Sequence, residues 1–396
     1  MRQFSLREYE VAEFAPVPPD LGRGLAGTGL VDAAQTLDGR LRLTARSVVG
    51  AARVEAAGEV VELRVHPKLP IRRLMWMLSH AAEDSGWRED DVAFSPDEEL
   101  VPAIAAAFVA VTRRALAPGV LHGYKTVEAA LPVLRGRLRE ADQVRGRLGL
   151  APPLEVRYDD YCADIPENQI LLAAVQRLTR LPGVRPRSRR ELHRFAVALC
   201  EVTALAPRQP LPATRPNRLS ARYEPALRLA RLILAGQSTE QPAGDVSAVG
   251  FAFDLNKVFE RWLTVALGAA LTSQHGGTIV AHHRVDLDET GRVTMYPDIT
   301  WWRGGECAAV IDAKYKALHG ASSPNADVYQ MLAYCSRLGL RHGHLIYGTP
   351  ARGHGEYHLV GSGVRVAARG LDLAAPLAAV RAQLAALAAD IAQAAP

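Results

Sequence analysis

The stretch Val310-Ile-Asp-Ala-Lys-Tyr-Lys316 places an acid and a lysine two residues apart at the end of an apolar run. Lysine is rare in this chain, with five residues among the 47 that are Lys or Arg, and only Lys314 has an acidic residue two positions before it. Alternate side chains of a strand share a face, so a strand here puts Asp312 and Lys314 on the same side. Because Asp312 directly follows four apolar residues, we expect a carboxylate at the open end of a buried strand, where a charge needs a partner.

A second carboxylate, in Pro297-Asp298, lies fourteen residues upstream of Asp312. The sequence predicts a strand over residues 292–302, a turn at Arg303-Gly-Gly-Glu306 and a short buried strand over 307–311. This hairpin is expected to bring Asp298 beside Asp312. Two carboxylates on neighbouring strands supply the hard oxygen ligands that Mg²⁺ prefers, with positions left for water and phosphate oxygens.

Lys314 gives such a site a defined chemistry. An ammonium next to the metal could orient or help deprotonate an attacking water and offset the charge that develops on a phosphorane. The pattern therefore predicts metal-assisted phosphodiester hydrolysis. Ordinary structural explanations exist for each part, because Pro-Asp is common in turns, as at Pro19-Asp20, and an Asp-x-Lys pair on a strand is often solvated.

Two helices are predicted to flank the hairpin. Residues 325–337 form one, opened by an Asn325 cap and closed by Gly339, with Gln330 and Tyr334 four apart on one face. Residues 253–263 form the other, and Glu260 lies beside its apolar stripe. For Gln330, Tyr334 and Glu260, an ordinary amphipathic edge is the alternative interpretation.

The order of these elements resembles a known nuclease core. A helix with Glu260, a hairpin with Asp298, a strand with Asp312 and Lys314, and a helix with Gln330 and Tyr334 are similar to a PD-(D/E)xK nuclease of the type that carries an added Gln-x-x-x-Tyr motif. Residues 254–334 resemble most the nuclease domain of the McrC family, the cleavage subunits of McrBC modification-dependent restriction systems. The Asp-Ala-Lys-Tyr-Lys segment is among the most specific parts of this resemblance.

Upstream segments extend the resemblance over nearly the whole chain. Val49-Gly50, followed by a strand and Leu63-Arg-Val-His-Pro-Lys-Leu-Pro70, is similar to the end of that family's amino-terminal region. Leu131-Pro-Val-Leu-Arg-Gly-Arg137 and Tyr158-Asp-Asp-Tyr-Cys-Ala-Asp-Ile-Pro-Glu-Asn168 resemble its middle region.

The resemblance implies a fold and a site. It implies an α+β multidomain protein whose C-terminal part is a restriction-endonuclease-like PD-(D/E)xK α/β core, with a mixed central sheet flanked by helices. Asp298 and Asp312 would hold Mg²⁺, with Mn²⁺ as a possible substitute, and Glu260 would complete the metal shell. Lys314 would be the catalytic lysine, and Gln330 and Tyr334 would support the site or the nearby backbone phosphate.

The resemblance also implies partners. The chain would be the endonuclease subunit of an anti-phage restriction system that cuts DNA, double-stranded and modified, together with an AAA+ GTPase of the McrB type that it stimulates. GTP would enter only through that partner, since the chain has no Gly-x-x-x-x-Gly-Lys-Ser/Thr loop. Two alternatives stay open: an activator or assembly factor of the motor that does not cleave, and a nuclease that acts alone.

Patterning along the chain predicts three regions. Residues 1–95 carry short alternating strands and are expected to form a β-rich domain, the candidate for docking on the motor. Residues 96–245 show mainly helical spacing, and residues 246–396 are expected to form the nuclease domain. A Gly-, Ser- and Pro-bearing stretch over 236–250 is expected to be the linker into it.

Composition is compatible with this organisation. The 396 residues are 48% hydrophobic, which supports sizeable cores, and the net charge of +5 permits a nucleic-acid surface without requiring one. The sequence has neither an apolar run long enough to cross a bilayer nor a signal-peptide core, so no membrane association and a cytoplasmic location are expected. The four cysteines lack paired metal spacing, which makes zinc an unexpected ligand.

Three further groups of residues, two of arginines and one of histidines, are most simply explained by structural roles or contacts. The arginines of 185–190 are best explained as solvated surface, with phosphate binding as the alternative. Gly136, between Arg135 and Arg137, indicates a structural or partner contact. Adjacent residues on a strand face opposite sides, so His282 and His283 are not expected to share a metal, and both are interpreted as structural.

Overall fold

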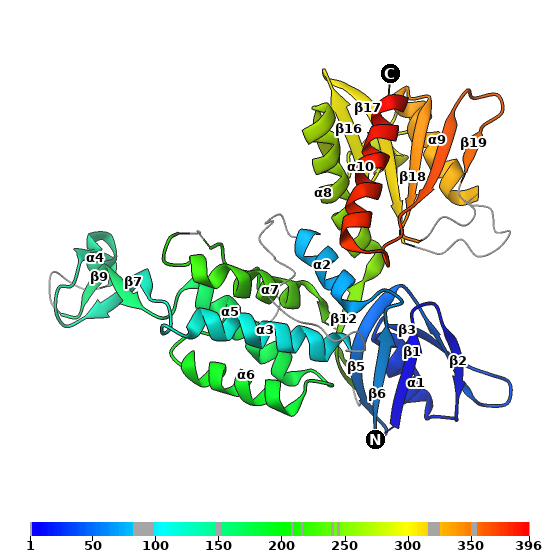
Figure 1. Ribbon diagram of the computed structural model, residues 1–396. Helices are drawn as coiled ribbons and strands as arrows, with labels where there is room; N and C mark the ends of the chain where they lie inside the picture. The colour runs from blue at the N-terminus through cyan, green and yellow to red at the C-terminus, as the bar shows by residue number, and fades with distance from the viewer. Residues whose placement is uncertain are drawn as a thin grey trace. The chain divides into compact units, whose positions relative to one another are not determined.

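The computed structural model describes residues 2–81, 99–146, 152–206, 209–214, 217–238, 241–243, 246–315, 325–349 and 355–395 (Figure 1). Contacts divide the chain into two compact units: Met1–Leu100 together with Gln237–Pro396, and Val101–Gly236. The first unit therefore contains both ends of the chain. The boundary expected after residue 95, and Lys316, lie outside the described residues.

The N-terminal part of the first unit is mainly β-structure. Its larger sheet has the order β1 (Arg2–Arg7), β6 (Glu59–His66), β5 (Val48–Ala56), β12 (Val246–Asp254), β10 (Gln237–Ser238), and β11 (Gln241–Ala243) also pairs with β12. A smaller sheet has the order β2 (Val11–Phe14), β4 (Leu41–Ala45), β3 (Val31–Gln35), and the helices of this part are α1 (Pro19–Gly27) and α2 (Ile71–Ala81). Period-two burial explains the strands: Val61, Leu63 and Val65 of β6 are buried and alternate with partly exposed residues.

The stretch expected to be a linker is instead part of this sheet. β12 pairs antiparallel with β5 from Ser247 opposite Glu55 to Asp254 opposite Val48. The region expected to be the nuclease domain from residue 246 thus begins with a strand of the N-terminal sheet. Gly250 and the flanking Ser and Pro residues are typical of a loop when only the local sequence is considered, and the partner strand that fixes this conformation lies about 200 residues earlier.

The C-terminal part of the same unit contains a mixed sheet. Its described strands have the order β13 (Thr278–Ala281), β16 (Ile299–Arg303), β17 (Glu306–Lys314), β18 (His342–Tyr347), β20 (Arg365–Gly370), β19 (Glu356–His358). β17 runs antiparallel to β16 and parallel to β18. The predicted hairpin is confirmed, because Gly304 (φ 59°) and Gly305 (φ 91°) form its turn in the left-handed region that favours glycine. The expected long strand over 292–302 is interrupted at Pro297, between β15 (Thr294–Met295, which pairs with β14, Val285–Asp286) and β16.

Helices cover both faces of this sheet. α9 (Asn325–Leu338) packs against buried residues of β17, β18 and β20, among them Val310, Leu345 and Val366. α8 (Leu255–His275) and α10 (Leu377–Ala394) lie together over the opposite face (Figure 1). Both predicted helices are present as α8 and α9, but the helix expected from residue 253 begins at Leu255, because Phe253 and Asp254 end strand β12. Asp254 caps α8 by accepting a hydrogen bond from the Asn256 amide (3.0 Å), and Gly339 (φ 70°) follows the end of α9.

Gly343 sets how closely α9 approaches β18, and its substitution gives the first prediction. A Cβ at this position would lie 2.4 Å from Met331 Cγ and 2.8 Å from Cys335 Sγ. Gly343→Ala should therefore lower the free energy of unfolding by about 1–3 kcal/mol through overpacking, measured by urea titration. Gly355→Ala is the control, because a Cβ there has no atom within 4 Å. Equal stability of the two variants would contradict this account of α9 packing.

The second unit contains the helices expected for the middle region. They are α3 (Leu100–Leu116), α4 (Glu140–Gly146), α5 (Pro166–Arg180), α6 (Pro186–Ala198) and α7 (Glu224–Ala235), with a 3-10 turn at Ala221–Tyr223. It also contains a sheet that the helical spacing did not predict, with the order β7 (Gly123–Leu131), β9 (Leu154–Cys162), β8 (Arg137–Leu138). Most residues of β7 and β9 are partly or fully exposed, so these strands lack the regular buried face by which a strand is recognised in sequence.

Within the described part of the chain, every helix is too short or too polar to span a bilayer.

Candidate active site

Asp312 and Lys314 lie near the end of β17, on the face that α9 covers. The Lys314 ammonium forms an ion pair with Asp312 Oδ2, which confirms that the two side chains share a side of the strand. The Asp312 residue is 1% exposed, as expected for a carboxylate that continues a buried strand. The other group that faces the Asp312 carboxyl is the carboxyl of Asp298, which repels it when both are ionised.

Asp298 lies on the neighbouring chain segment, just before β16. Its Oδ2 accepts a hydrogen bond from the Ala313 amide (2.8 Å), and Ile299 is paired with Ile311 in the sheet. The hairpin therefore brings the two aspartates together, as the sequence predicted. This proximity follows from the tight Gly-Gly turn, which fixes the register of β16 against β17.

Gln330 and Tyr334 extend the site along α9. Lys314 Nζ donates to Gln330 Oε1 (3.1 Å), and Gln330 Nε2 donates to the Tyr334 hydroxyl (2.7 Å). Tyr334 is 2% exposed and donates in turn to the Tyr296 carbonyl (3.4 Å). The helical spacing of four that placed both residues on one face thus produces a continuous hydrogen-bonded chain from the lysine to the core.

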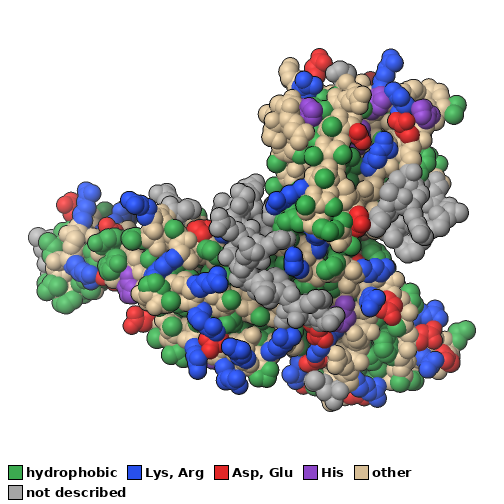
Figure 2. Space-filling model, in the orientation of Figure 1, with side chains coloured by type: hydrophobic (Ala, Val, Ile, Leu, Met, Phe, Trp, Pro, Cys, Tyr) green, Lys and Arg blue, Asp and Glu red, His purple; other side chains and the backbone are tan. Residues whose placement is uncertain are grey.

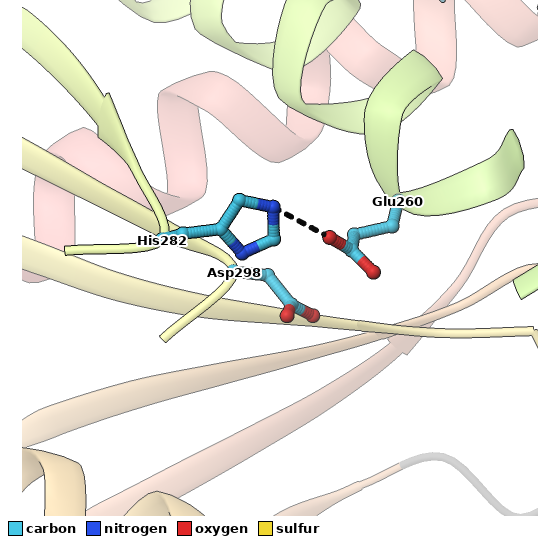
Figure 3. Close-up of side chains that lie close together, drawn as sticks. All are labelled: Glu260, His282 and Asp298. Carbon is cyan, nitrogen blue, oxygen red and sulfur yellow. Dashed lines mark ion pairs between the residues drawn. The ribbon is translucent and has the colours of Figure 1, made fainter. Parts of the chain in front are cut away.

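Glu260 approaches the aspartates from α8 (Figure 3). Its Oε1 lies 3.1 Å from His282 Nε2, and one ligand atom each of Glu260, His282 and Asp298 lie within 4.8 Å of one another. Figure 3 shows the three side chains pointing toward a common space. All sequence-predicted site residues are therefore near one another at one edge of the sheet.

His282 is a site residue that the sequence interpretation missed. It was interpreted as structural together with His283, and only His283 fits that interpretation, because its ring packs against Trp302 at 5.1 Å between centroids. His282 has φ 47°, and its amide donates to the Asp298 carbonyl (3.2 Å). His282 lies in a turn just after β13 (Thr278–Ala281), so strand alternation does not set its direction, and its left-handed backbone turns the side chain toward Glu260.

The carboxyl groups of the site repel one another and are poorly hydrated. Burial, followed by the charge of Asp298, raises the pKa of Asp312 to about 7. Burial is also the main cause that raises the pKa of Asp298 and of Glu260. Burial alone would lower the pKa of Lys314, but the carboxylates around it, Asp312 first and then Asp298 and Asp327, together outweigh burial and raise the pKa.

These properties fit a divalent cation. Three carboxylates and one imidazole face a single ammonium, and the buried Asp312 carboxylate has only that ammonium to offset its charge among the described residues. A buried negative charge of this kind is costly unless it is paired or coordinates a metal. Carboxylate oxygens suit Mg²⁺ and Mn²⁺, and an added imidazole favours transition metals such as Mn²⁺ over Mg²⁺.

The arginine cluster around Gly136 has structural partners in the second unit. Arg135 pairs with Asp160 (2.6 Å) and its guanidinium lies 4.0 Å from the ring centroid of Tyr158. Gly136 has φ 71°, and a Cβ there would lie 2.4 Å from the Arg157 carbonyl, so this glycine permits close approach to β9.

On the face seen in Figure 2, Lys and Arg side chains are interspersed with Asp and Glu.

Comparison with known proteins gives a family and a fold. The model of the family described as McrBC 5-methylcytosine restriction system component matches residues 43–348. A chain of the half-complex from the tetradecameric assembly of Thermococcus gammatolerans McrB AAA+ hexamers with bound McrC is similar in fold, with a TM-score of 0.61 and 18% identity, over 97% of this chain and 100% of that chain. A chain of the T. gammatolerans McrBC complex matches with a TM-score of 0.43 and 20% identity over 68% of this chain and 88% of that chain. No curated protein matches the chain.

Proposed function

This chain belongs to the family of McrBC 5-methylcytosine restriction system components, and we propose that it is the Mg²⁺-dependent DNA endonuclease subunit of such a system. The observation that supports this best is the convergence of Asp298, Asp312 and Lys314 at one edge of a mixed sheet, with Gln330 hydrogen-bonded to the lysine. This is the arrangement expected of a PD-(D/E)xK nuclease core.

Asp298, Asp312 and Glu260 are the proposed metal ligands. Their shared excess of negative charge and their position around one space are the features that support this assignment. His282 adjoins Glu260 and is proposed as a further ligand, which would make Mn²⁺ an effective substitute for Mg²⁺. When bound, the cation would supply Lewis-acid stabilisation of a phosphodiester and would lower the pKa of a water.

The protein's own side chains would position the attacking water and neutralise the charge that develops on the scissile phosphate. Lys314 presents a compact ammonium that is held between Asp312 and Gln330, where it can orient a water and offset charge developing on the scissile phosphate. Gln330 fixes the direction of the ammonium, and the buried Tyr334 hydroxyl fixes Gln330. Burial of Asp312 keeps water from competing for the carboxylate.

The proposed substrate is double-stranded, modified DNA, and the proposed partner is an AAA+ GTPase of the McrB type. Family membership supports a role in restriction. The partner is suggested by the chain of similar fold, which belongs to an assembly of McrB AAA+ hexamers with bound McrC. Recognition of the modified base and turnover of GTP would both belong to the partner.

Gln330→Ala tests the hydrogen-bonded chain on α9. Without the amide, the Lys314 ammonium loses a fixed acceptor, so we expect cleavage to slow about tenfold at saturating Mg²⁺, while the affinity for metal stays unchanged. Single-turnover rates on linear DNA give the readout. Ser336→Ala, an exposed substitution on the same helix, is the control. A tenfold loss in both variants, or in neither, would remove Gln330 from the site.

The proposal as a whole is tested with plasmid DNA, methylated and unmethylated. The purified protein is incubated with Mg²⁺, with and without an AAA+ GTPase of the McrB type and GTP. We expect cleavage of methylated plasmid only when both proteins and GTP are present. Cutting by the protein alone would indicate a nuclease that acts independently, and stimulated GTP hydrolysis without any cutting would indicate an activator of the motor.

A further inference from the structure

Two hydrogen bonds join the N-terminal sheet to the end of the strand that carries Lys314. The Tyr9 hydroxyl donates to the Tyr315 carbonyl (2.7 Å), and the Tyr315 hydroxyl donates to Glu8 Oε1 (3.2 Å). Glu8 and Tyr9 follow β1, and Tyr315 directly follows Lys314. All of these residues belong to the first compact unit. The contact is reciprocal, since each segment donates one hydrogen bond and accepts one.

The residues that make this contact are held at a cost to stability. Glu8 is 1% exposed, and burial raises its pKa although the Lys68 amide donates to Oε1 (2.6 Å). Its Oε2 has no hydrogen-bond partner among the described residues. Tyr9 has φ 59°, in the left-handed region that non-glycine residues rarely adopt. A buried carboxyl and a strained backbone at the same place indicate a role beyond packing.

A second N-terminal segment, at Ser47 between β4 and β5, holds the start of α8, which carries Glu260. The Ser47 carbonyl accepts a hydrogen bond from the Leu255 amide (2.9 Å), and Ser47 Oγ accepts one from Asn256 Nδ2 (2.7 Å). The Phe259 ring, next to Glu260, packs against Tyr315 with 6.0 Å between centroids. Two elements that bring ligands to the candidate site are thus fixed at their ends by neighbouring N-terminal residues.

The backbone around Lys314 depends on these contacts. Its own carbonyl accepts a hydrogen bond from the Gly348 amide (3.0 Å), and the next carbonyl along the chain is the one that Tyr9 holds. Ala313, on the other side of Lys314, donates its amide to Asp298 (2.8 Å). A shift of the Tyr315 carbonyl would therefore move Lys314 and also disturb the hydrogen bond between the Ala313 amide and Asp298.

We propose that Tyr9, with Glu8 behind it, is a positioning residue of the nuclease site: it fixes the Tyr315 backbone and thereby the placement of Lys314 against Asp312. The inference rests on the proposed nuclease function and adds a residue from the N-terminal sheet to the site. Displacement of a reacting group by about 1 Å can cost on the order of 10²-fold in rate, so even a partial loosening is measurable.

The first test is Tyr9→Phe, which removes only the hydroxyl. We expect the cleavage rate at saturating DNA to fall about tenfold, with an unchanged KM for DNA and an unchanged thermal midpoint. Tyr124→Phe, at an exposed tyrosine of the second unit, is the matched control. Glu8→Gln keeps the acceptor for the Tyr315 hydroxyl and should retain the wild-type rate, whereas Glu8→Ala should reproduce the loss. Equal rates for Tyr9→Phe, Glu8→Ala and wild type would overturn the proposal.

A second measurement separates this proposal from the proposed function. Hydrogen exchange of the Ala313 amide reports the placement of β17 without any cleavage. We expect faster exchange at Ala313 in Tyr9→Phe, with no change in the β18 amides that pair on the far side of the strand. If the wild type does not cleave DNA, the nuclease function fails and this exchange alone decides the positioning role. Unchanged exchange at Ala313 would then contradict it.

Discussion

Asp312→Asn is expected to abolish Mg²⁺-dependent DNA cleavage and at the same time to stabilise the metal-free fold above pH 7. The amide keeps the size of the side chain but removes a charge that a metal needs, so the loss in rate should be roughly 10³-fold or more. The gain in stability follows because Asp312 is buried beside Asp298, and burial together with the charge of Asp298 outweighs the favourable ion pair with Lys314.

The pH dependence of this gain has a definite sign. The pKa of Asp312 is raised to about 7 in the folded protein, above its ordinary value of about 3.9 in an unfolded chain. The folded state therefore binds more protons in this interval, and the stability contributed by Asp312 is lost as the pH rises from about 4 to about 7. The difference in thermal midpoint between Asp312→Asn and wild type should grow through the same window.

Added metal should make the wild type the more stable of the two proteins. Mg²⁺ should bind the folded wild type and raise its thermal midpoint, whereas the midpoint of Asp312→Asn should not respond. Asp288→Asn is the control, because hydrogen bonds from Thr290 and Val293 lower the pKa of this exposed carboxyl. That variant should keep both cleavage and the metal response. An Asp312→Asn protein that cuts DNA at the wild-type rate would remove Asp312 from the proposed active site.

Lys314→Arg is expected to reduce cleavage by about 10²-fold although it keeps the positive charge. The Lys314 ammonium is held between Asp312 Oδ2 and Gln330 Oε1, in a position that suits a compact donor. A guanidinium is a broad planar fork, so it can pair with the carboxylate but cannot direct a single compact donor at a water or a phosphate oxygen in the same way. Metal binding should be retained, since the carboxylates are unchanged.

Two measurements on the same preparations separate metal binding from cleavage. Isothermal titration with Mn²⁺ reports metal binding, and single-turnover kinetics report cleavage. Lys125→Arg is the control, because Lys125 also pairs with an aspartate, Asp164, but lies in the second unit. We expect that variant to cut normally. Full activity of Lys314→Arg would show that the site requires only a positive charge there.

The sequence predicted best those parts of the site that local signals determine. The turn at Gly304 and Gly305 and the spacing of Gln330 and Tyr334 along α9 are encoded by residues within a few positions of one another. These signals were sufficient to place Asp298 beside Asp312 and to put Gln330 and Tyr334 on one helical face. The strand alternation in turn was sufficient to pair Asp312 with Lys314.

Features fixed by distant partners were not predictable in this way. Residues 236–250 have the local composition of a linker, whereas the strand that orders them, β5, lies about 200 residues earlier in the sequence. His282 was interpreted as structural because neither its backbone conformation nor the approach of Glu260 from α8 is visible in the local pattern. The link from Tyr9 to Tyr315 joins residues 306 positions apart, and no periodicity indicates it.

The most direct test of the nuclease site is cleavage of methylated plasmid by wild type and Asp312→Asn side by side, with the AAA+ partner and GTP present and Mg²⁺ or EDTA added. We expect wild type to produce cut DNA with Mg²⁺ and none with EDTA, and Asp312→Asn to produce none in either, while both proteins stimulate GTP hydrolysis equally. Cleavage that persists in Asp312→Asn, or in EDTA, would contradict a metal-dependent site built on Asp298, Asp312 and Lys314.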